Sequence, residues 1–418
     1  MSRMIIVFFF WLAFLLLDWY IYRGLKYSFP LEGKPLIKVI SNFAYWSVPL
    51  TLTAMTIYFF FIKNGEKPST TWILGFMGVF ILFYVPKLIL LLFNLVADFK
   101  NILFWIAAKF EFGRKPDFSG VLITRQEFLR ILGTFIAALP FASILYGIVF
   151  GRFAFRTEKK TIKTSKLNAG TRLRVVQISD AHLGSFLDHK KPVRTAINEI
   201  NKLEPDLILF TGDLVNDIAS EAEPWVPEFS KLQAKYGKYS VLGNHDYGDY
   251  YKWDSVEEKR ANLDRLKTIH GEMGFTLMLN EGDYIEIEGQ QIYLGGVENW
   301  GLPPFPQHGD IERALAKYNP DAFGILMSHD PTHFDEQVKT HQKAPDLTLS
   351  GHTHGMQFGL ILGSFKWSPV QYRYKKWAGT YMHQDKMLYV NRGFGYIGFP
   401  GRVGMPPEIS LFEIEGQA

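Results

Sequence analysis

Long uncharged apolar stretches in the first 150 residues constrain the fold of this chain more than any other feature. Ser41–Ile62 and Ile131–Phe150 contain no charged residue, and Ile5–Leu17 is apolar throughout and is followed by Trp19 and Tyr20. About 20 residues of α-helix are needed to cross the hydrocarbon core of a bilayer, and aromatic residues favour its headgroup level. We therefore expect residues 1–150 to be a transmembrane anchor of about four helices, in a multi-pass protein of the cell membrane.

A third apolar stretch, Trp72–Val96, is interrupted by Pro86 and Lys87. Two interpretations stay open: the helix ends early, or it continues and Lys87 extends its amine towards the nearer interface. The sequence offers Lys87 no obvious ionisable partner, whereas a transporter would place paired ionisable groups inside its spans. The first stretch has the apolar core of a signal peptide, but no small-residue cleavage site follows it. We therefore interpret the region as a retained anchor.

A basic segment separates the apolar region from the rest of the chain. Residues 151–171 contain six Lys or Arg residues and one Glu. We interpret this segment as a linker that is either solvated or rests on anionic lipid headgroups. Because Lys and Arg next to a membrane span favour the cytoplasmic side, we expect the domain that follows, residues 172–418, to lie in the cytoplasm.

The periodicity of the second half is that of an α/β domain. β-branched, strand-like runs at Arg172–Ser179, Asp206–Thr211 and Lys238–Leu242 alternate with helical patterns at Val193–Leu203 and Trp225–Tyr236. Such alternation is typical of layered α/β folds. Further strand-like runs follow a third helical pattern, Ser255–His270, at Gln290–Gly295, Phe323–Ser328, Asp346–Ser350, Met387–Val390 and Ile409–Ile414.

Polar side chains follow five of these expected strands at the point where each strand ends. The loops at the carboxyl ends of strands in α/β sheets converge on one crevice. We therefore expect these carboxylate, carboxamide and imidazole groups to form one pocket. The residues are Asp180 and His182; Asp213; Asn244, His245 and Asp246; His329; and His352 and His354.

The chemistry of this set predicts a site for two divalent metal ions. Oxygen and imidazole nitrogen ligands suit such ions, and the chain has no Cys, so Mn, Fe and Zn all remain plausible. Asp180 and His182 are two positions apart, so their side chains point the same way if the strand continues through them. His352 and His354 repeat this spacing.

The ordered motifs Asp-x-His, Gly-Asp, Gly-Asn-His-Asp, His and Gly-His-x-His resemble those of the calcineurin-like metallophosphoesterase superfamily over Arg172–Glu415. The motifs at His352–Gln357, Trp377–Tyr381 and Tyr389–Gly395 resemble a bacterial membrane-associated branch. That branch includes a UDP-diacylglucosamine pyrophosphatase. Met356 stands where the branch often has Gly. The resemblance implies a layered α-β-β-α sandwich preceded by the transmembrane helices.

The resemblance also implies roles for individual residues. It places His245 opposite the scissile phosphate as a general acid or charge stabiliser, oriented by Asp246. It implies one metal ion held by Asp180, His182, Asp213 and His354, and a second held by Asp213, Asn244, His329 and His352, with Asp213 bridging.

From these residues we expect a membrane-anchored phosphohydrolase that cleaves a phosphodiester or pyrophosphate bond by metal-activated hydroxide. A lipid-linked substrate, a nucleotide and a phosphoprotein all stay open, and the alternative class is a non-catalytic membrane sensor or scaffold. Arg392 and Arg402 are candidates to bind a second phosphate, or else ordinary surface arginines. Aromatic segments at Trp300–Phe305 and Asp249–Trp253 either contact acyl chains or form core and rim. The net charge of +4 favours no nucleic-acid partner.

Overall fold

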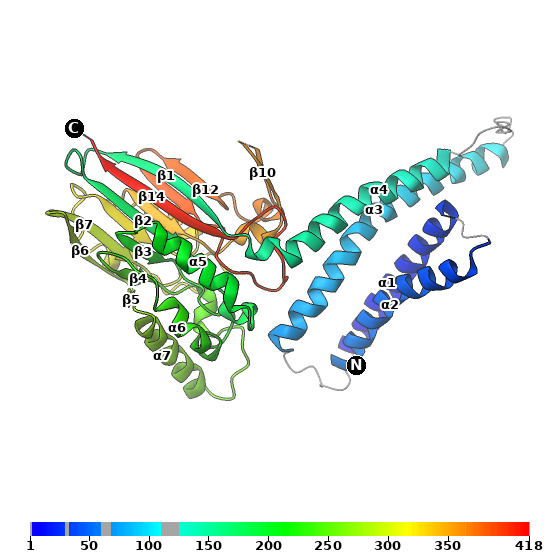
Figure 1. Cartoon of the computed structure of the whole chain (residues 1–418), viewed down its shortest axis with the longest axis horizontal. Helices are drawn as coiled ribbons and strands as arrows, with labels where there is room; N and C mark the ends of the chain where they lie inside the picture. Colours follow the sequence, from blue (N-terminus) through cyan, green and yellow to red (C-terminus); the bar gives the residue numbers. More distant parts are fainter. Residues whose placement is uncertain (1, 30–32, 60–67, 110–124, 364, 418) are drawn as a thin grey trace. The chain divides into compact units, whose positions relative to one another are not determined.

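The computed structural model of the protein describes residues 2–29, 33–59, 68–109, 125–363 and 365–417. The chain forms two compact units, Met1–Tyr146 and Gly147–Ala418 (Figure 1). As the sequence predicts, the first unit consists of long apolar helices, and the second contains alternating strands and helices.

The described residues of the first unit form four helices, as expected. They are α1 (Ser2–Ser28), α2 (Pro35–Ile57), α3 (Thr70–Lys109) and α4 (Arg125–Val149). Within the described residues, three segments are long and apolar enough to cross a membrane, Val7–Tyr27, Thr70–Phe99 and Glu127–Phe153. The shorter α2 is not among them, and the expected end of its span at Ile62 lies outside the described residues.

Pro86 does not end the third helix, because α3 continues through it to Lys109. Lys87 also has a partner, contrary to our expectation: its amine forms an ion pair with Asp18 on α1, and both side chains are buried. Tyr84 donates a hydrogen bond of 2.7 Å to the same carboxylate, and the Tyr45 hydroxyl of α2 donates to the Asp18 carbonyl oxygen at 2.8 Å. Three helices therefore meet at one buried charge pair. Because Lys87 has a partner, the lack of one can no longer be used to exclude a transporter.

A second polar contact joins α4 to α3. Arg130 donates to the Asp98 carboxylate at 2.8 Å, and Tyr20 of α1 donates to its other oxygen at 2.8 Å. In hydrocarbon an isolated charge is costly, so ionisable groups in spans face the interior of the bundle and pair with one another. These two pairs give the helices a defined register.

We predict that removing either partner of the Asp18–Lys87 pair destabilises the bundle more than removing both charges. Breaking a buried pair by deleting one partner costs about 3–5 kcal/mol, because the other charge is left uncompensated. Asp18→Asn and Lys87→Met should each lower the Tm of the detergent-solubilised chain, and the double variant should recover part of the loss. Strictly additive losses in thermal unfolding would contradict a direct coupling.

The second unit is built around two six-stranded sheets. In the first, the order is β1 (Arg156–Thr164), β14 (Glu408–Gly416), β2 (Arg172–Ile178), β3 (Leu207–Phe210), β4 (Lys238–Ser240) and β5 (Thr276–Leu277). In the second, it is β12 (Gly379–His383), β13 (Lys386–Val390), β9 (Leu347–Ser350), β8 (Gly324–Met327), β7 (Gln290–Gly296) and β6 (Glu281–Ile287). Strands β2 to β5 are mutually parallel, and so are β7, β8, β9 and β13.

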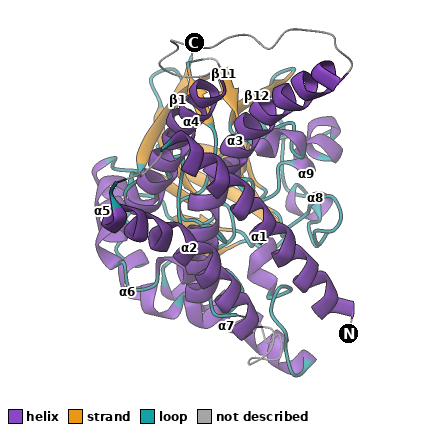
Figure 2. Ribbon diagram, turned by 90° about the vertical axis from the view of Figure 1, so that its right-hand side faces the viewer, coloured by secondary structure: helices purple, strands orange, loops and turns teal. Residues whose placement is uncertain are grey.

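Helices cover the outer faces of the sheets and confirm the expected α-β-β-α layering. Figure 2 shows α5 (Lys190–Lys202), α6 (Val226–Phe229) and α7 (Val256–Glu272) on one side of the strands, and α8 (Ile311–Ala314) and α9 (Thr332–Glu336) on the other. The helix expected at Trp225–Tyr236 is wrong in length, because α6 ends at Phe229.

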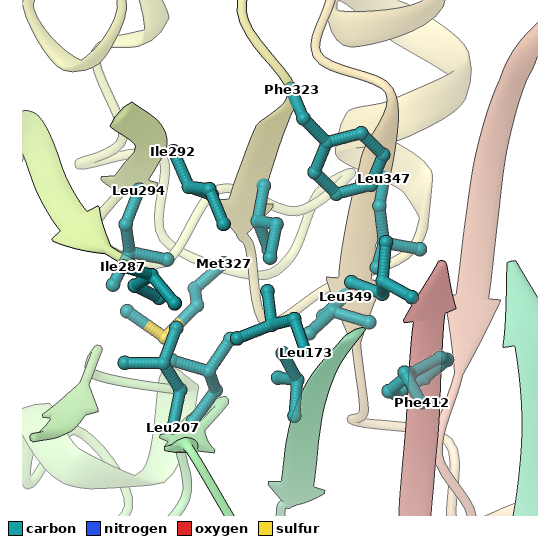
Figure 3. Packing of buried hydrophobic residues seen from close by; sticks show 14 of the residues in the cluster. Leu173, Leu207, Ile287, Ile292, Leu294, Phe323, Met327, Leu347, Leu349 and Phe412 are labelled. Atoms are coloured by element: carbon teal, nitrogen blue, oxygen red, sulfur yellow. The ribbon is translucent and has the colours of Figure 1, made fainter. Parts of the chain in front are cut away.

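The two sheets pack face to face through a single apolar core. Leu173 and Leu207 of the first sheet face Leu294, Met327 and Leu349 of the second, and all five side chains are buried (Figure 3). Every residue of β3, β8 and β9 is buried, since each of these central strands has the opposing sheet on one face and helices on the other. This packing holds the loops of both sheets at fixed positions.

The segment expected to be a basic linker belongs to the domain. Residues Arg156–Thr164 form β1, which pairs in parallel with β14 from Arg156↔Glu408 to Thr164↔Gly416. Ile162 packs against the core while Lys159 and Lys163 are exposed. Alternating outward lysines are typical of an edge strand, where they discourage pairing with other chains.

Candidate metal centre

The polar residues expected to gather after the strands do so in the structure. They occupy the loops at the carboxyl ends of β2, β3 and β4 in the first sheet and of β8 and β9 in the second. Two groups of His and Asp side chains lie close enough to hold a metal ion each. The groups are Asp180, His182 and His354, and Asp213, His329 and His352.

The first group presents two imidazole nitrogens to each other. His182 Nε2 lies 3.0 Å from His354 Nε2, and His354 Nε2 lies 3.3 Å from Asp180 Oδ1. His182 Nδ1 is 3.1 Å from the Val215 carbonyl oxygen, so its N–H donates there and Nε2 carries the lone pair. A carbonyl that fixes the tautomer in this way is a common device behind metal-binding histidines.

The second group is arranged in the same manner. His329 Nε2 lies 3.1 Å from Asp213 Oδ2 and 3.3 Å from His352 Nδ1, while His329 Nδ1 faces the Thr211 carbonyl oxygen at 2.7 Å. Asn244 Oδ1 is 2.8 Å from His352 Nδ1, and the amide nitrogen of Asn244 donates to the Tyr250 hydroxyl at 2.9 Å. The amide oxygen of Asn244 is thereby directed to the site.

One carboxylate oxygen is shared between the groups. Asp213 Oδ2 lies 3.1 Å from His329 Nε2 and 3.6 Å from His182 Nε2. Asp213 Oδ1 accepts the backbone N–H of His245 at 2.8 Å, which holds the carboxylate between the two groups. Oxygen and imidazole donors that converge on two adjacent points fit a pair of divalent cations.

Burial sets the protonation of these groups. It lowers the pKa of His182 to about 3 and the pKa of His354 well below its usual value, so both rings are neutral and offer lone pairs. Burial also opposes a charge on His329, but the Asp213 carboxylate outweighs it and raises the pKa of His329 to about 10. A bound cation would take the place of that proton, because metal ligation requires the neutral imidazole.

Left-handed backbone, and not strand alternation, directs these side chains. Strand β2 ends at Ile178 and β9 at Ser350, so neither strand continues through these residues and their two-residue spacing does not set the direction of their side chains. Asp180, His182, Asp213, His352 and His354 all have φ between 45° and 71°. Non-glycine residues are uncommon in this region, and they cluster at functional sites that the surrounding structure holds in place.

Two glycines allow the backbone to approach the carboxylates. A Cβ atom at Gly243 would overlap the Asp213 carboxylate, and one at Gly351 would overlap the Asp180 carboxylate. The glycines of the Gly-Asn-His-Asp and Gly-His-x-His motifs are therefore required by space at the site.

Asp246 does not orient His245 as expected. The Asp246 carboxylate accepts backbone N–H groups of Gly243, Asp213 and Leu214 at 2.8–2.9 Å and of Val215 at 3.3 Å. His245 Nδ1 instead contacts the Asn216 carbonyl oxygen at 2.6 Å. Its ring is half-buried, with its centroid 4.9 Å from that of His182. A carbonyl partner leaves no signature in the sequence.

The two arginines proposed to bind a second phosphate are internal. Arg392 is buried and ion-paired with Glu408 and, at 2.7 Å, with Glu158. Arg402 is 1% exposed and donates to the carbonyl oxygens of Gly395 (2.7 Å) and Arg392 (2.8 Å). Its remaining nitrogen lies 3.1 Å from His354 Nδ1. Both guanidinium groups are engaged within the domain and are not available to a substrate, and that of Arg402 contacts the candidate ligand His354.

Comparison with known proteins identifies the family. The model described as "Calcineurin-like phosphoesterase" matches residues 173–356, and the one described as "Probable Calcineurin-like phosphoesterase, transmembrane domain" matches residues 2–152. An uncharacterized metallophosphoesterase of Bacillus subtilis is 31% identical over 303 residues, which cover 70% of this chain and 98% of that protein. The chain belongs to the calcineurin-like metallophosphoesterases.

Two further relatives are similar over much of this chain. An uncharacterized metallophosphoesterase of Campylobacter jejuni is 26% identical over 399 residues, 92% of this chain and 94% of that protein. A transmembrane protein with a metallophosphoesterase domain from Danio rerio is 28% identical over 297 residues, 68% of this chain and 62% of its own length. The metallophosphoesterase described here is thus a multi-pass membrane enzyme with the Asp and His groups of a metal-dependent phosphoesterase. A closer similarity to the UDP-diacylglucosamine pyrophosphatase stays a prediction.

Aromatic residues surround the metal centre of this metallophosphoesterase. The Tyr374 hydroxyl lies 2.7 Å from His352 Nε2, and the Phe305 ring is perpendicular to the His352 ring with centroids 4.6 Å apart. The Tyr250 ring packs on the His245 ring, with the two ring centroids 4.5 Å apart. Phe305 and Tyr250 lie in the aromatic segments noted in the sequence, whereas Tyr374 was missed because it lies outside those segments and outside the motifs.

We predict that Asp246→Ala abolishes metal binding as well as turnover. The substitution leaves four buried backbone N–H groups without an acceptor, at a cost of about 1–3 kcal/mol for each such group. Elemental analysis of the purified chain should show loss of metal relative to Asp254→Ala, an exposed aspartate nearby. Full metal content in Asp246→Ala would show that the turn forms without the carboxylate.

Proposed function

We propose that this enzyme hydrolyses a phosphodiester or pyrophosphate bond at two divalent ions held between the sheets. The observation that carries the proposal is the shared Asp213 oxygen, which adjoins His182 in one group and His329 in the other. The proposed ligands are Asp180, His182, Asp213 and His354 for one ion, and Asp213, Asn244, His329 and His352 for the other. All of them follow the carboxyl ends of strands of the two large sheets.

Two such ions, when bound, activate water and neutralise charge on a phosphoryl group. The protein's own contribution is to place a proton donor beside them. We assign this role to His245, whose Nδ1–H donates to the Asn216 carbonyl oxygen and leaves Nε2 to carry the transferable proton. Because the His245 ring is only half-buried, the leaving oxygen of a substrate can approach Nε2.

We further propose a lipid-linked phosphate as substrate, for example UDP-diacylglucosamine. The membrane-spanning helices support this proposal, since they keep the enzyme at a bilayer where such a substrate is concentrated. The aromatic rings of Phe305 and Tyr250 at the metal centre provide apolar surface next to the proposed reaction. The complete set of candidate ligands supports catalysis over a purely sensory role. Location of the site on the cytoplasmic side stays a prediction.

Hydrolysis of bis-p-nitrophenyl phosphate by the detergent-solubilised chain should depend on metal. Chelation with EDTA should abolish release of p-nitrophenol, and Mn²⁺, Fe²⁺ or Zn²⁺ should restore it in the wild type. Asp213→Asn should stay inactive after metal addition, because both ions lose a charged ligand. Activity that survives in chain shown by elemental analysis to be metal-free would overturn the proposal.

His245→Ala should lower kcat while leaving the metal content unchanged. General acid catalysis contributes typically about 10²–10⁴-fold to the rate, so a loss of that size is expected with a phosphodiester whose leaving group is an unactivated alcohol, and a smaller loss with bis-p-nitrophenyl phosphate, whose p-nitrophenolate departs without a proton. His383→Ala, on strand β12 away from the proposed ligands, is the control and should retain wild-type kcat. Near-normal turnover of the unactivated phosphodiester by His245→Ala would remove His245 from the mechanism.

A further inference from the structure

A short hairpin stands apart from the two large sheets. Strands β10 (Leu360–Leu362) and β11 (Phe365–Trp367) form a two-stranded sheet of their own, drawn as a separate ribbon in Figure 1. The strands pair in antiparallel register, Leu360 with Trp367, Ile361 with Lys366 and Leu362 with Phe365. Cross-strand partners share one face of such a ribbon.

One face of the hairpin is anchored to the domain. Ile361 packs against a buried cluster that includes Tyr374, Trp377 and Met405. Lys366, its partner on that face, donates from its amine to the Ala378 carbonyl oxygen and to the Tyr381 hydroxyl, both at 2.8 Å. The orientation of the ribbon is therefore determined, and the opposite face must point outward.

The outward face carries large apolar side chains where polar ones are usual. Leu360, Leu362 and Phe365 are 44%, 64% and 58% exposed. Among the described residues from 187 onward, ten large hydrophobic side chains are exposed, and six of them lie between residues 356 and 382. The other three of these six are Met356, Tyr372 and Met382. A concentration of exposed apolar surface in one short stretch indicates an interaction site.

The same stretch is basic. Residues 352–384 contain four Lys or Arg residues and no Asp or Glu. Lys366 and Lys376 have partners within the domain, but Arg373 and Lys375 are exposed. Apolar and aromatic side chains together with basic ones are the combination that binds the surface of an anionic bilayer.

We propose that the hairpin β10–β11 is a membrane-docking element, which inserts Leu360, Leu362 and Phe365 into the headgroup region of an anionic bilayer. A bilayer is the occupant favoured over a protein partner, because the chain carries its own membrane-spanning helices and the exposed charges complement anionic lipid. This surface is independent of the proposed hydrolysis. The hairpin and the metal centre share one contact residue, because Tyr374 belongs to the cluster on which Ile361 packs and also contacts His352.

The complete lack of Cys in the chain allows a direct test. Leu362→Cys would be labelled with nitrobenzoxadiazole in the full-length protein, reconstituted into vesicles of phosphatidylglycerol and phosphatidylcholine in equal parts. We expect blue-shifted emission and quenching by lipids that carry a nitroxide high on the acyl chain. The control is Val256→Cys, which is 78% exposed at the start of α7 and should show water-like emission without such quenching.

The charge component is tested by the same label. Adding Arg373→Glu and Lys375→Glu, or replacing phosphatidylglycerol with phosphatidylcholine, should reduce the quenching of the Leu362→Cys label. Wild-type hydrolysis of bis-p-nitrophenyl phosphate in the labelled protein would show that the domain is folded and active, whatever the label reports. Two results would overturn the proposal. One is emission equal to that of the Val256→Cys control, and the other is a label shielded from aqueous iodide yet not quenched by nitroxide lipid, which would indicate a protein partner.

Discussion

The contact between the Asp213 carboxylate and the His329 imidazole, 3.1 Å apart, joins loops from two separate sheets. Asp213 follows β3 of the first sheet and His329 follows β8 of the second. They meet because Leu207 and Leu209 pack against Met327 and its neighbours in the core between the sheets. The metal centre is thus a product of sheet packing, and each half of its ligand set would be incomplete without the opposing sheet.

The local backbone converts that packing into ligand geometry. Left-handed φ angles at Asp180, His182 and Asp213 turn the side chains inward at the points where the strands stop. Asp246 offsets the cost of the turn by accepting backbone N–H groups from two loops, and Arg402 supports the ring of His354 from behind. Asp246 and Arg402, for which we expected a part in the chemistry, therefore hold the candidate ligands in place. Such outer contacts orient the groups that bind a metal ion.

The membrane unit follows the same rule that a buried charge has a partner. Asp18 and Lys87 lie 69 positions apart, and Asp98 and Arg130 lie 32 apart, yet each pair closes within the bundle. These ion pairs define the register of the helices, because a charge left unpaired in a low-dielectric surrounding is costly. A catalytic domain on such an anchor stays at the bilayer, where the outward apolar face of β10–β11 also finds a suitable environment.

The apolar stretches, the central strands and the ordered Asp, Asn and His motifs were readable from the sequence, because hydrophobic periodicity and residues that end strands are local signals. β1, Asp18, Asn216 and the buried environments of Arg392 and Arg402 were not readable. β1 is a strand only because β14, some 250 residues later, pairs with it, and Arg392 is internal only because Glu408 and Glu158 meet it there. The sequence by itself determined the layers and the kinds of ligand. Tertiary structure decided which groups touch, since contacts between distant residues arise from packing that no local pattern encodes.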